Sequence, residues 1–298
     1  MNSMQNPANK GLMILILPTF LTLVAITVLP ILITFAISMF YIKLTSTGGP
    51  VFIGLENYVE LFTDDRFLNS LVVTVELIFI PVALQIVIGL MLAMILKEKL
   101  PGMGWMRIAF LLPAVIPPAV SGLVWKLFIV PGAGGLTYGA SLLGMDLSLD
   151  LLSMPSTALA VIIATSVWVG TPFVALLMLS ALESIGEEQY EAARIDGANW
   201  FERHWYISVP EMLPVIVTVT VFRILEALAI FPIIFVLTGG GPAGSTEPIN
   251  YYAYVNGFEY LRVDYAATII FFFFVAMMGA TAPFLINIAR REGREARQ

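Results

Sequence analysis

The sequence predicts an all-α membrane protein with six transmembrane helices. Hydrophobic residues make up 59% of the 298 residues and charged residues only 12%, with a mean hydropathy of +0.90, whereas charged residues reach about a quarter of a soluble domain. A spanning helix needs about 20 apolar residues. Six stretches meet that length, at residues 12–42, 71–96, 108–129, 157–182, 213–237 and 265–289. We therefore expect one transmembrane domain over residues 1–298.

The first apolar stretch and the positive charges predict the orientation. Residues 12–42 are too long for the apolar region of a signal peptide, which has about 7–15 residues, so we expect a retained anchor. With both termini on the cytoplasmic side, ten of the lysines and arginines fall in cytoplasmic segments and four in external ones. Positive residues favour the cytoplasmic side, so both termini are predicted to be cytoplasmic.

Several classes of site are excluded by the sequence. The chain has no cysteine and one histidine, and it contains neither a zinc-protease nor a serine-hydrolase motif. The glycine-rich stretch 238–248 (TGGGPAGSTEP) lacks the G-K-[ST] ending of a phosphate-binding loop and is interpreted as a turn. We expect no enzyme activity and no cofactor in this chain.

The charged segment 183–210 lies between the fourth and fifth stretches and predicts two short helices with a break. Gly197 can end the first helix in the left-handed conformation. Asn199 is placed to cap the second helix, with Glu202 three residues later completing a capping box. Pro210 is expected to limit the second helix, because the residue before a proline disfavours the α conformation.

Two interpretations of this segment compete. It is either an ordered loop or a docking element for a partner. The large aromatic side chains of Trp200, Phe201 and Trp205, together with small alanines nearby, favour docking, because exposed apolar patches usually mark partner surfaces.

The same segment resembles a family signature. Glu191-Ala192-Ala193, then Asp196-Gly197-Ala198, then Ile207 and Pro210 are similar to the EAA loop of permease subunits of bacterial ABC importers, in particular the carbohydrate-uptake group with the maltose and glycerol-phosphate permeases. Two positions depart from the family pattern. His204 stands where phenylalanine is usual, and Val209 where leucine is usual. The resemblance covers most of the chain, including Phe222-Arg223 in the fifth stretch.

The resemblance implies a type I ABC importer permease with a cytoplasmic coupling helix in the bacterial inner membrane. It implies ATP-hydrolysing subunits in two copies, which bind ATP and magnesium, a second permease subunit that makes the permease heterodimeric, a periplasmic solute-binding protein, a sugar-like substrate and membrane lipid, but no nucleic acid. The predicted ATPase-coupling interface comprises Glu191, Ala192, Ala193, Asp196, Gly197, Ala198, Ile207 and Pro210.

A possible substrate path is indicated by polar residues within the apolar stretches. Arg223 and Glu226 lie three residues apart on one helix face, and because buried charges in membranes are costly, they either neutralise each other beside a neighbouring subunit or line the path. The resemblance implies a substrate pocket on the fourth and fifth stretches. The predicted path residues are Ser166, Trp168, Gly170, Arg223, Glu226 and Ala227.

The expected function is ATP-driven movement of a sugar or sugar derivative from periplasm to cytoplasm by alternating access. The alternative is a non-ABC secondary transporter or channel for a small polar solute. The sequence leaves open which sugar is carried, whether it is anionic, and whether the partner permease shares its contacts.

Overall fold

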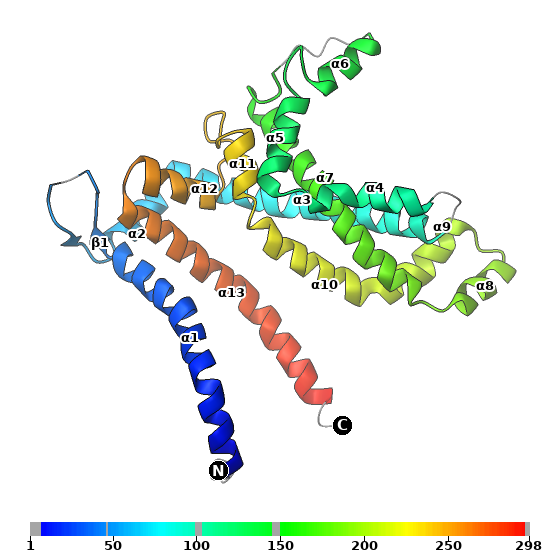
Figure 1. The fold of residues 1–298 in the computed structure, drawn as a ribbon, viewed down its shortest axis with the longest axis horizontal. Helices are drawn as coiled ribbons and strands as arrows, with labels where there is room; N and C mark the ends of the chain where they lie inside the picture. The colour runs from blue at the N-terminus through cyan, green and yellow to red at the C-terminus, as the bar shows by residue number, and fades with distance from the viewer. Residues whose placement is uncertain (1–6, 46, 99–102, 145–149, 296–298) are drawn as a thin grey trace. The chain divides into compact units, whose positions relative to one another are not determined.

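The computed structural model describes residues 7–45, 47–98, 103–144 and 150–295, and their regular structure is mostly helical (Figure 1). The chain divides into two compact units. One comprises Met1–Leu68 and Tyr252–Gln298, and the other comprises Asn69–Tyr251. Each unit is described by itself below.

The first unit is built around two long helices, α1 (Pro7–Ser38) and α13 (Val263–Glu295), which pack against each other. The rings of Phe35 and Phe271 contact across this pair with centroids 4.8 Å apart. The remaining elements are β1 (Phe40–Tyr41), β2 (Val51–Phe52), α2 (Glu56–Thr63) and the π-helical η3 (Val255–Glu259). β1 and β2 pair antiparallel, with Phe40 opposite Phe52.

Asp64 joins the elements of this unit. Its carboxylate accepts hydrogen bonds from the backbone N–H groups of Arg66 (2.9 Å) and Phe67 (3.3 Å) and from the phenol hydroxyls of Tyr252 and Tyr265. Partial burial raises the pKa of Asp64, but these hydrogen bonds outweigh it, so the pKa lies below its ordinary value of 3.8. The ionised carboxylate of Asp64 therefore stabilises the contacts between the start of α3 (Asp65–Lys97), α12 (Ile249–Tyr254) and α13.

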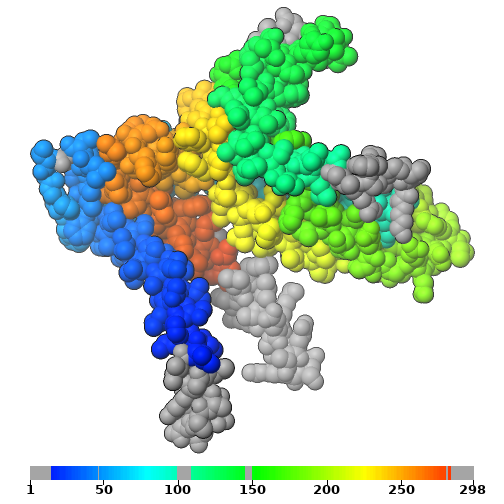
Figure 2. Space-filling model, in the orientation of Figure 1, coloured from blue at the N-terminus to red at the C-terminus, as the bar shows by residue number. Residues whose placement is uncertain are grey.

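The second unit contains the helices between residues 69 and 251. They are α3 (Asp65–Lys97, entering from the first unit), α4 (Met103–Val115), α5 (Pro118–Phe128), α6 (Gly135–Leu142), α7 (Pro155–Glu183), α8 (Glu187–Ile195), α9 (Trp200–Arg203), the π-helical η2 (His204–Ser208), α10 (Val209–Ala227), α11 (Phe231–Leu237) and α12 (Ile249–Tyr254). α7 packs against α4, α5 and α10, and α5 packs against α11. The region of α6 projects from this unit (Figure 2).

One apolar core joins α3, α7, α8 and α10. Ala93, Met178, Leu182 and Met212 are almost completely buried in it. Tyr190 of α8 reaches the same core. At roughly 1.5–3 kcal/mol for each large buried side chain, this core holds the 183–210 segment firmly to the long helices.

Helices occupy each of the six stretches predicted to span the membrane, but two of them are interrupted. Among the described residues, four helices are long and apolar enough to cross a membrane, and a fifth crossing is possible if a bent pair is counted. That pair, α4 and α5, is bent by 115° within the predicted stretch 108–129. Pro117 and Pro118 follow each other there, and each removes a backbone donor and disfavours helix before it.

The predicted stretch 213–237 is also interrupted. α10 ends at Ala227 and α11 begins at Phe231, with Pro232 in the first turn of the new helix. Hydropathy remains high across both breaks, so a prediction from hydropathy could not find them. The count of six crossings remains a prediction.

The expectation that Pro210 ends the second short helix was wrong. α9, η2 and α10 form one uninterrupted helical run from Trp200 to Ala227, as Figure 1 shows for α9 and α10. In η2 the N–H of Val209 bonds to the carbonyl of His204, five residues earlier. This wider turn accommodates a proline that would clash with the tighter α-helical ladder.

Candidate functional site

The first helix of the 183–210 segment, α8, ends in a Schellman motif around Gly197. Gly197 has φ +82°, the left-handed conformation that favours glycine. Its N–H bonds to the carbonyl of Arg194 at 3.1 Å, and the N–H of Ala198 bonds to the carbonyl of Ala193 at 2.9 Å. These bonds satisfy carbonyls that the helix end would leave free. The predicted left-handed C-cap conformation of Gly197 is confirmed.

The second helix begins with the predicted capping box. The side chain of Asn199 accepts a hydrogen bond from the N–H of Glu202 at 2.9 Å, and the carboxylate of Glu202 accepts from the N–H of Asn199 at 2.8 Å. Only one residue, Ala198, separates this cap from Gly197. The corner between the two helices therefore has a defined backbone geometry.

Polar contacts inside the segment bind it to the long helices. The hydroxyl of Tyr190 and Nδ1 of His204 each lie 2.8 Å from Oγ of Ser208. Lys97, at the end of α3, places its ammonium 3.8 Å from the Tyr190 ring centroid and donates to the carbonyl of Leu182 at 3.0 Å. One cation thus links α3, α7 and α8.

Glu98 adds a second link to the same segment. Nε1 of Trp200 donates to its carboxylate at 2.9 Å, and Nε2 of His204 lies 3.8 Å from the same oxygen. His204 is buried, and its ring also packs edge-on against Trp200. The departure from the family pattern at this position is therefore a packed core residue.

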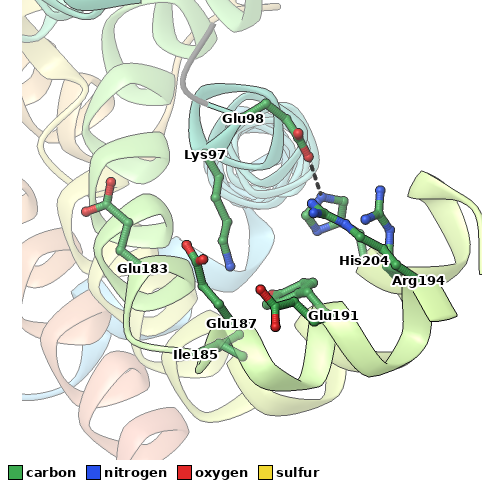
Figure 3. Close-up of a pocket in the computed structure, with 10 residues that line it drawn as sticks. Lys97, Glu98, Glu183, Ile185, Glu187, Glu191, Arg194 and His204 are labelled. Carbon is green, nitrogen blue, oxygen red and sulfur yellow. Dashed lines mark ion pairs between the residues drawn. The ribbon is translucent and has the colours of Figure 1, made fainter.

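A hollow of about 510 Å³ opens beside α8. In Figure 3, Lys97 and the carboxylates of Glu187 and Glu191 point into it. The ionisable residues that line it are Lys97, Glu98, Glu183, Glu187, Tyr190, Glu191, Arg194, Arg203 and His204. Such a charged depression suits a polar partner surface better than an apolar ligand.

The predicted coupling residues fall into two groups by exposure. Glu191, Ala192, Asp196, Gly197 and Pro210 are exposed, whereas Ala193, Ala198 and Ile207 are half-buried. The side chain of Ile207 packs against the apolar core.

Sequence reasoning missed Ile195, the most exposed large apolar residue of this segment. Its side chain is 86% exposed, at the last position of α8 beside the Gly197 turn. A large apolar residue at the polar end of a short helix is the sequence signal that indicates an exposed apolar side chain here.

A cavity of about 470 Å³, here named the Arg223 cavity, is lined by residues of α3, α4, α5, α7, α10 and α11. Its polar centre is a chain of contacts across three helices. Nε of Arg223 donates to Oε1 of Gln85 at 2.9 Å, and Nε2 of Gln85 donates to the carbonyl of Ser166 at 2.8 Å. Arg223 also forms an ion pair with Glu226, as their spacing predicted.

Gly170 permits this arrangement. A Cβ atom at Gly170 would overlap Nη2 of Arg223 and would lie 2.6 Å from Nε2 of Gln85. A side chain at this position would force the guanidinium or the amide to shift, so the absence of a side chain allows the two groups to meet as they do here. The predicted path residue Gly170 therefore affects the cavity by leaving room for the side chains of Arg223 and Gln85.

The other predicted path residues are placed differently. Ser166, Arg223, Glu226 and Ala227 line the cavity. Trp168 is absent from its lining, and its ring packs edge-on against Trp125 with centroids 6.2 Å apart. The cavity therefore brings together four of the six predicted residues, and Gly170 lies next to the side chains of Arg223 and Gln85.

Gln85 was missed by sequence reasoning although it connects the whole polar centre. It is buried in a helix that is otherwise strongly apolar. A buried amide in such a helix requires hydrogen-bond partners, and that requirement was the available signal. Its partners lie 81 and 138 residues away in the sequence, so no local pattern could identify them.

The chain matches the family of inner membrane components of binding-protein-dependent transport systems over residues 85–291. It is 37% identical over 241 residues to the trehalose/maltose transport permease MalF of Thermococcus litoralis, covering 81% of each chain. It is 33% identical over 279 residues to the trehalose transport permease SugA of Mycobacterium tuberculosis strain H37Rv, covering 90% of this chain and 89% of the relative.

The fold is similar to that of a chain in the crystal structure of a bacterial alginate ABC transporter in complex with an alginate-pentasaccharide-bound periplasmic protein. The TM-score is 0.79 at 22% identity, with 95% of each chain covered. The matched region 85–291 contains the 183–210 segment and the polar residues of the Arg223 cavity, which are Gln85, Ser166, Arg223 and Glu226. This protein belongs to the family of inner membrane components of binding-protein-dependent transport systems.

Proposed function

We propose that this chain is the permease subunit of an ATP-driven importer that moves a sugar or sugar derivative from periplasm to cytoplasm by alternating access. The 183–210 segment is the coupling element for a separate ATPase, and the Arg223 cavity is part of the solute path. The type I importer architecture, with six crossings and both termini cytoplasmic, belongs to the same proposal.

One observation carries the mechanism. The uninterrupted run from Trp200 to Ala227 has 28 residues, about 42 Å of helix. It begins at the corner beside Gly197 and carries Arg223 and Glu226 in its last two turns. A displacement of the corner can therefore reach the cavity as the movement of one rigid body.

The core that joins α3, α7, α8 and α10 supports the same mechanism. Because Tyr190 and Met212 share this core, α8 cannot shift alone without losing buried contacts. A partner that pulls α8 will therefore also pull α7 and α10. These helices carry Ser166, Gly170 and Arg223.

The names of the relatives support a carbohydrate as the solute. Two homologous permeases are described as carrying trehalose or maltose. The cavity fits such a solute, because it combines apolar walls with a few convergent polar groups. Phe173 supplies an aromatic ring to the lining, a surface that suits the apolar side of a sugar ring.

The proposal assigns the remaining roles to partners. Two copies of an ATP-hydrolysing subunit bind ATP and magnesium, a second permease subunit completes the path, and a periplasmic solute-binding protein delivers the solute. Among the residues that the structure describes, no group of three or more His, Cys, Asp or Glu side chains could hold a metal ion.

Reconstitution tests the proposal. The complex, purified with its partners and placed in liposomes, should accumulate a radiolabelled sugar only when ATP and the binding protein are present. A panel of sugars screened against the binding protein by thermal shift identifies the sugar to use. Equal accumulation driven by an ion gradient without ATP would refute the importer and favour a secondary transporter.

A further inference from the structure

We propose that the Arg223 cavity selects an uncharged sugar and that the Glu226 carboxylate accepts hydrogen bonds from its hydroxyl groups. This inference rests on the proposed function and names its substrate class. An arginine within an apolar helix suggests an anion site. The arrangement of its partners indicates the opposite.

The charges that line the cavity cancel. Of its described lining residues, only Arg223 and Glu226 are charged at neutral pH, and they form an ion pair. The cavity therefore offers an entering solute no net positive charge. A buried anion without a compensating cation would lose its hydration without recovering it.

The guanidinium is also engaged by neutral groups. Its Nε donates to Gln85, whose own amide is held by the Ser166 carbonyl, and its Nη2 lies in the space left by Gly170. These contacts fix the direction of Arg223. An anionic solute would have to break them before it could form a bidentate pair.

The carboxylate is the more accessible half of the ion pair. The side chain of Glu226 is 43% exposed, whereas that of Arg223 is 14% exposed. The carboxylate is therefore the charged group that an entering solute can reach more easily. A carboxylate accepts hydrogen bonds from hydroxyl groups and repels phosphate, sulfate or uronate groups.

The Ser166 hydroxyl is a further polar group in the lining of the cavity. Oγ of Ser166 is buried and has no hydrogen-bond partner among the described residues. Buried hydroxyls are normally paired, and this residue lines the cavity. Both the Ser166 hydroxyl and the Glu226 carboxylate can be paired by neutral hydroxyl groups, so neither requires a charged solute.

The test measures binding to the assembled transporter in nanodiscs without its binding protein, so that delivery does not determine the result. Trehalose and maltose are compared with their monophosphates at millimolar concentrations, by the shift in unfolding temperature. The wild type should bind the neutral sugars roughly tenfold more tightly than the monophosphates, the scale of one charged hydrogen bond.

Glu226→Gln should reduce or invert this preference, because it leaves the charge of Arg223 unopposed. Glu211→Gln, an exposed carboxylate in the first turn of the same helix, is the matched control and should keep the wild-type preference. Size-exclusion profiles and ATPase activity of each variant show whether the complex is assembled.

Stronger binding of the monophosphates to the wild type would overturn the inference, as would an unchanged preference in assembled Glu226→Gln. If no sugar shifts the unfolding temperature of a transporter that still imports one, the assignment of this cavity as the sugar site would be overturned. Absence of ATP-dependent sugar import by the wild type would instead refute the proposed function.

Discussion

Replacing Gly197 with valine tests whether the corner of the 183–210 segment must keep its geometry. Apart from its chain neighbours, no atom lies within 4 Å of a Cβ built at Gly197, so the main cost of the change is conformational. An L-residue in the left-handed region costs roughly 1–2 kcal/mol. If the backbone escapes to negative φ, the hydrogen bonds to the Arg194 and Ala193 carbonyls are lost, at about 0.5–1.5 kcal/mol each.

By either route the native corner is disfavoured by about 1–3 kcal/mol, which corresponds to a roughly 5- to 150-fold weaker interaction with a partner that needs it. The assay is the affinity of the purified ATPase for the permease in nanodiscs, together with sugar-stimulated ATP hydrolysis. Gly186→Val is the matched control. Gly186 also has open space around it, but its φ is −56°, which valine adopts readily. Equal affinities for the two variants would refute the reasoning.

Three further predictions concern Gly170 beside the cavity, Glu191 on α8 and Asp64 in the first unit. Gly170→Ala should lower sugar uptake and destabilise the protein by about 1–3 kcal/mol, because it breaks the charged and neutral hydrogen bonds of Arg223 and Gln85. Gly139 is a helical glycine with open space around it, so Gly139→Ala should change neither property. Transport assays and thermal unfolding compare the two variants. Glu191→Ala should weaken ATPase association more than Glu188→Ala, which removes an exposed carboxylate from the same helix, and equal co-purification would contradict a specific role. Because the pKa of Asp64 is lowered in the folded protein, its contribution to stability is fully present above the ordinary value of 3.8 and is lost as pH falls through the lower pKa of the folded state. The unfolding temperature of the wild type should therefore fall more steeply on acidification than that of Asp64→Asn, and parallel curves would show that this carboxylate is not responsible.

Local features of the site could be predicted from the sequence because they depend on neighbours within one or two turns. The left-handed conformation at Gly197, the Asn199–Glu202 box and the Arg223–Glu226 pair all involve spacings of three to five residues. Each has a geometric signature that a short stretch of sequence determines.

Features that depend on distant contacts or on helix breaks could not be predicted in this way. The role of Gln85 requires α3, α7 and α10 to meet. Gly170 matters only because the side chains of Arg223 and Gln85 occupy the space next to it. Trp168 satisfied the chemistry of a sugar site, yet packing turned it toward Trp125. Residue type predicted a polar centre here, whereas helix packing determined its members.

The π-helical turn before Pro210 explains how the helical run that starts in the 183–210 segment can remain stiff where it contains a proline. A proline in a helix interior normally breaks a hydrogen bond and introduces a kink, which would absorb movement before it reached Arg223. In this chain the wide turn accommodates the ring, and Ser208 within the turn is tied to Tyr190 of α8 and to His204. His204 also packs against Trp200, which is hydrogen-bonded to Glu98 after α3. The turn is therefore held by Tyr190 of α8 and by Glu98, the residue after α3, and on the proposed mechanism this bracing would pass a displacement of α8 along α10.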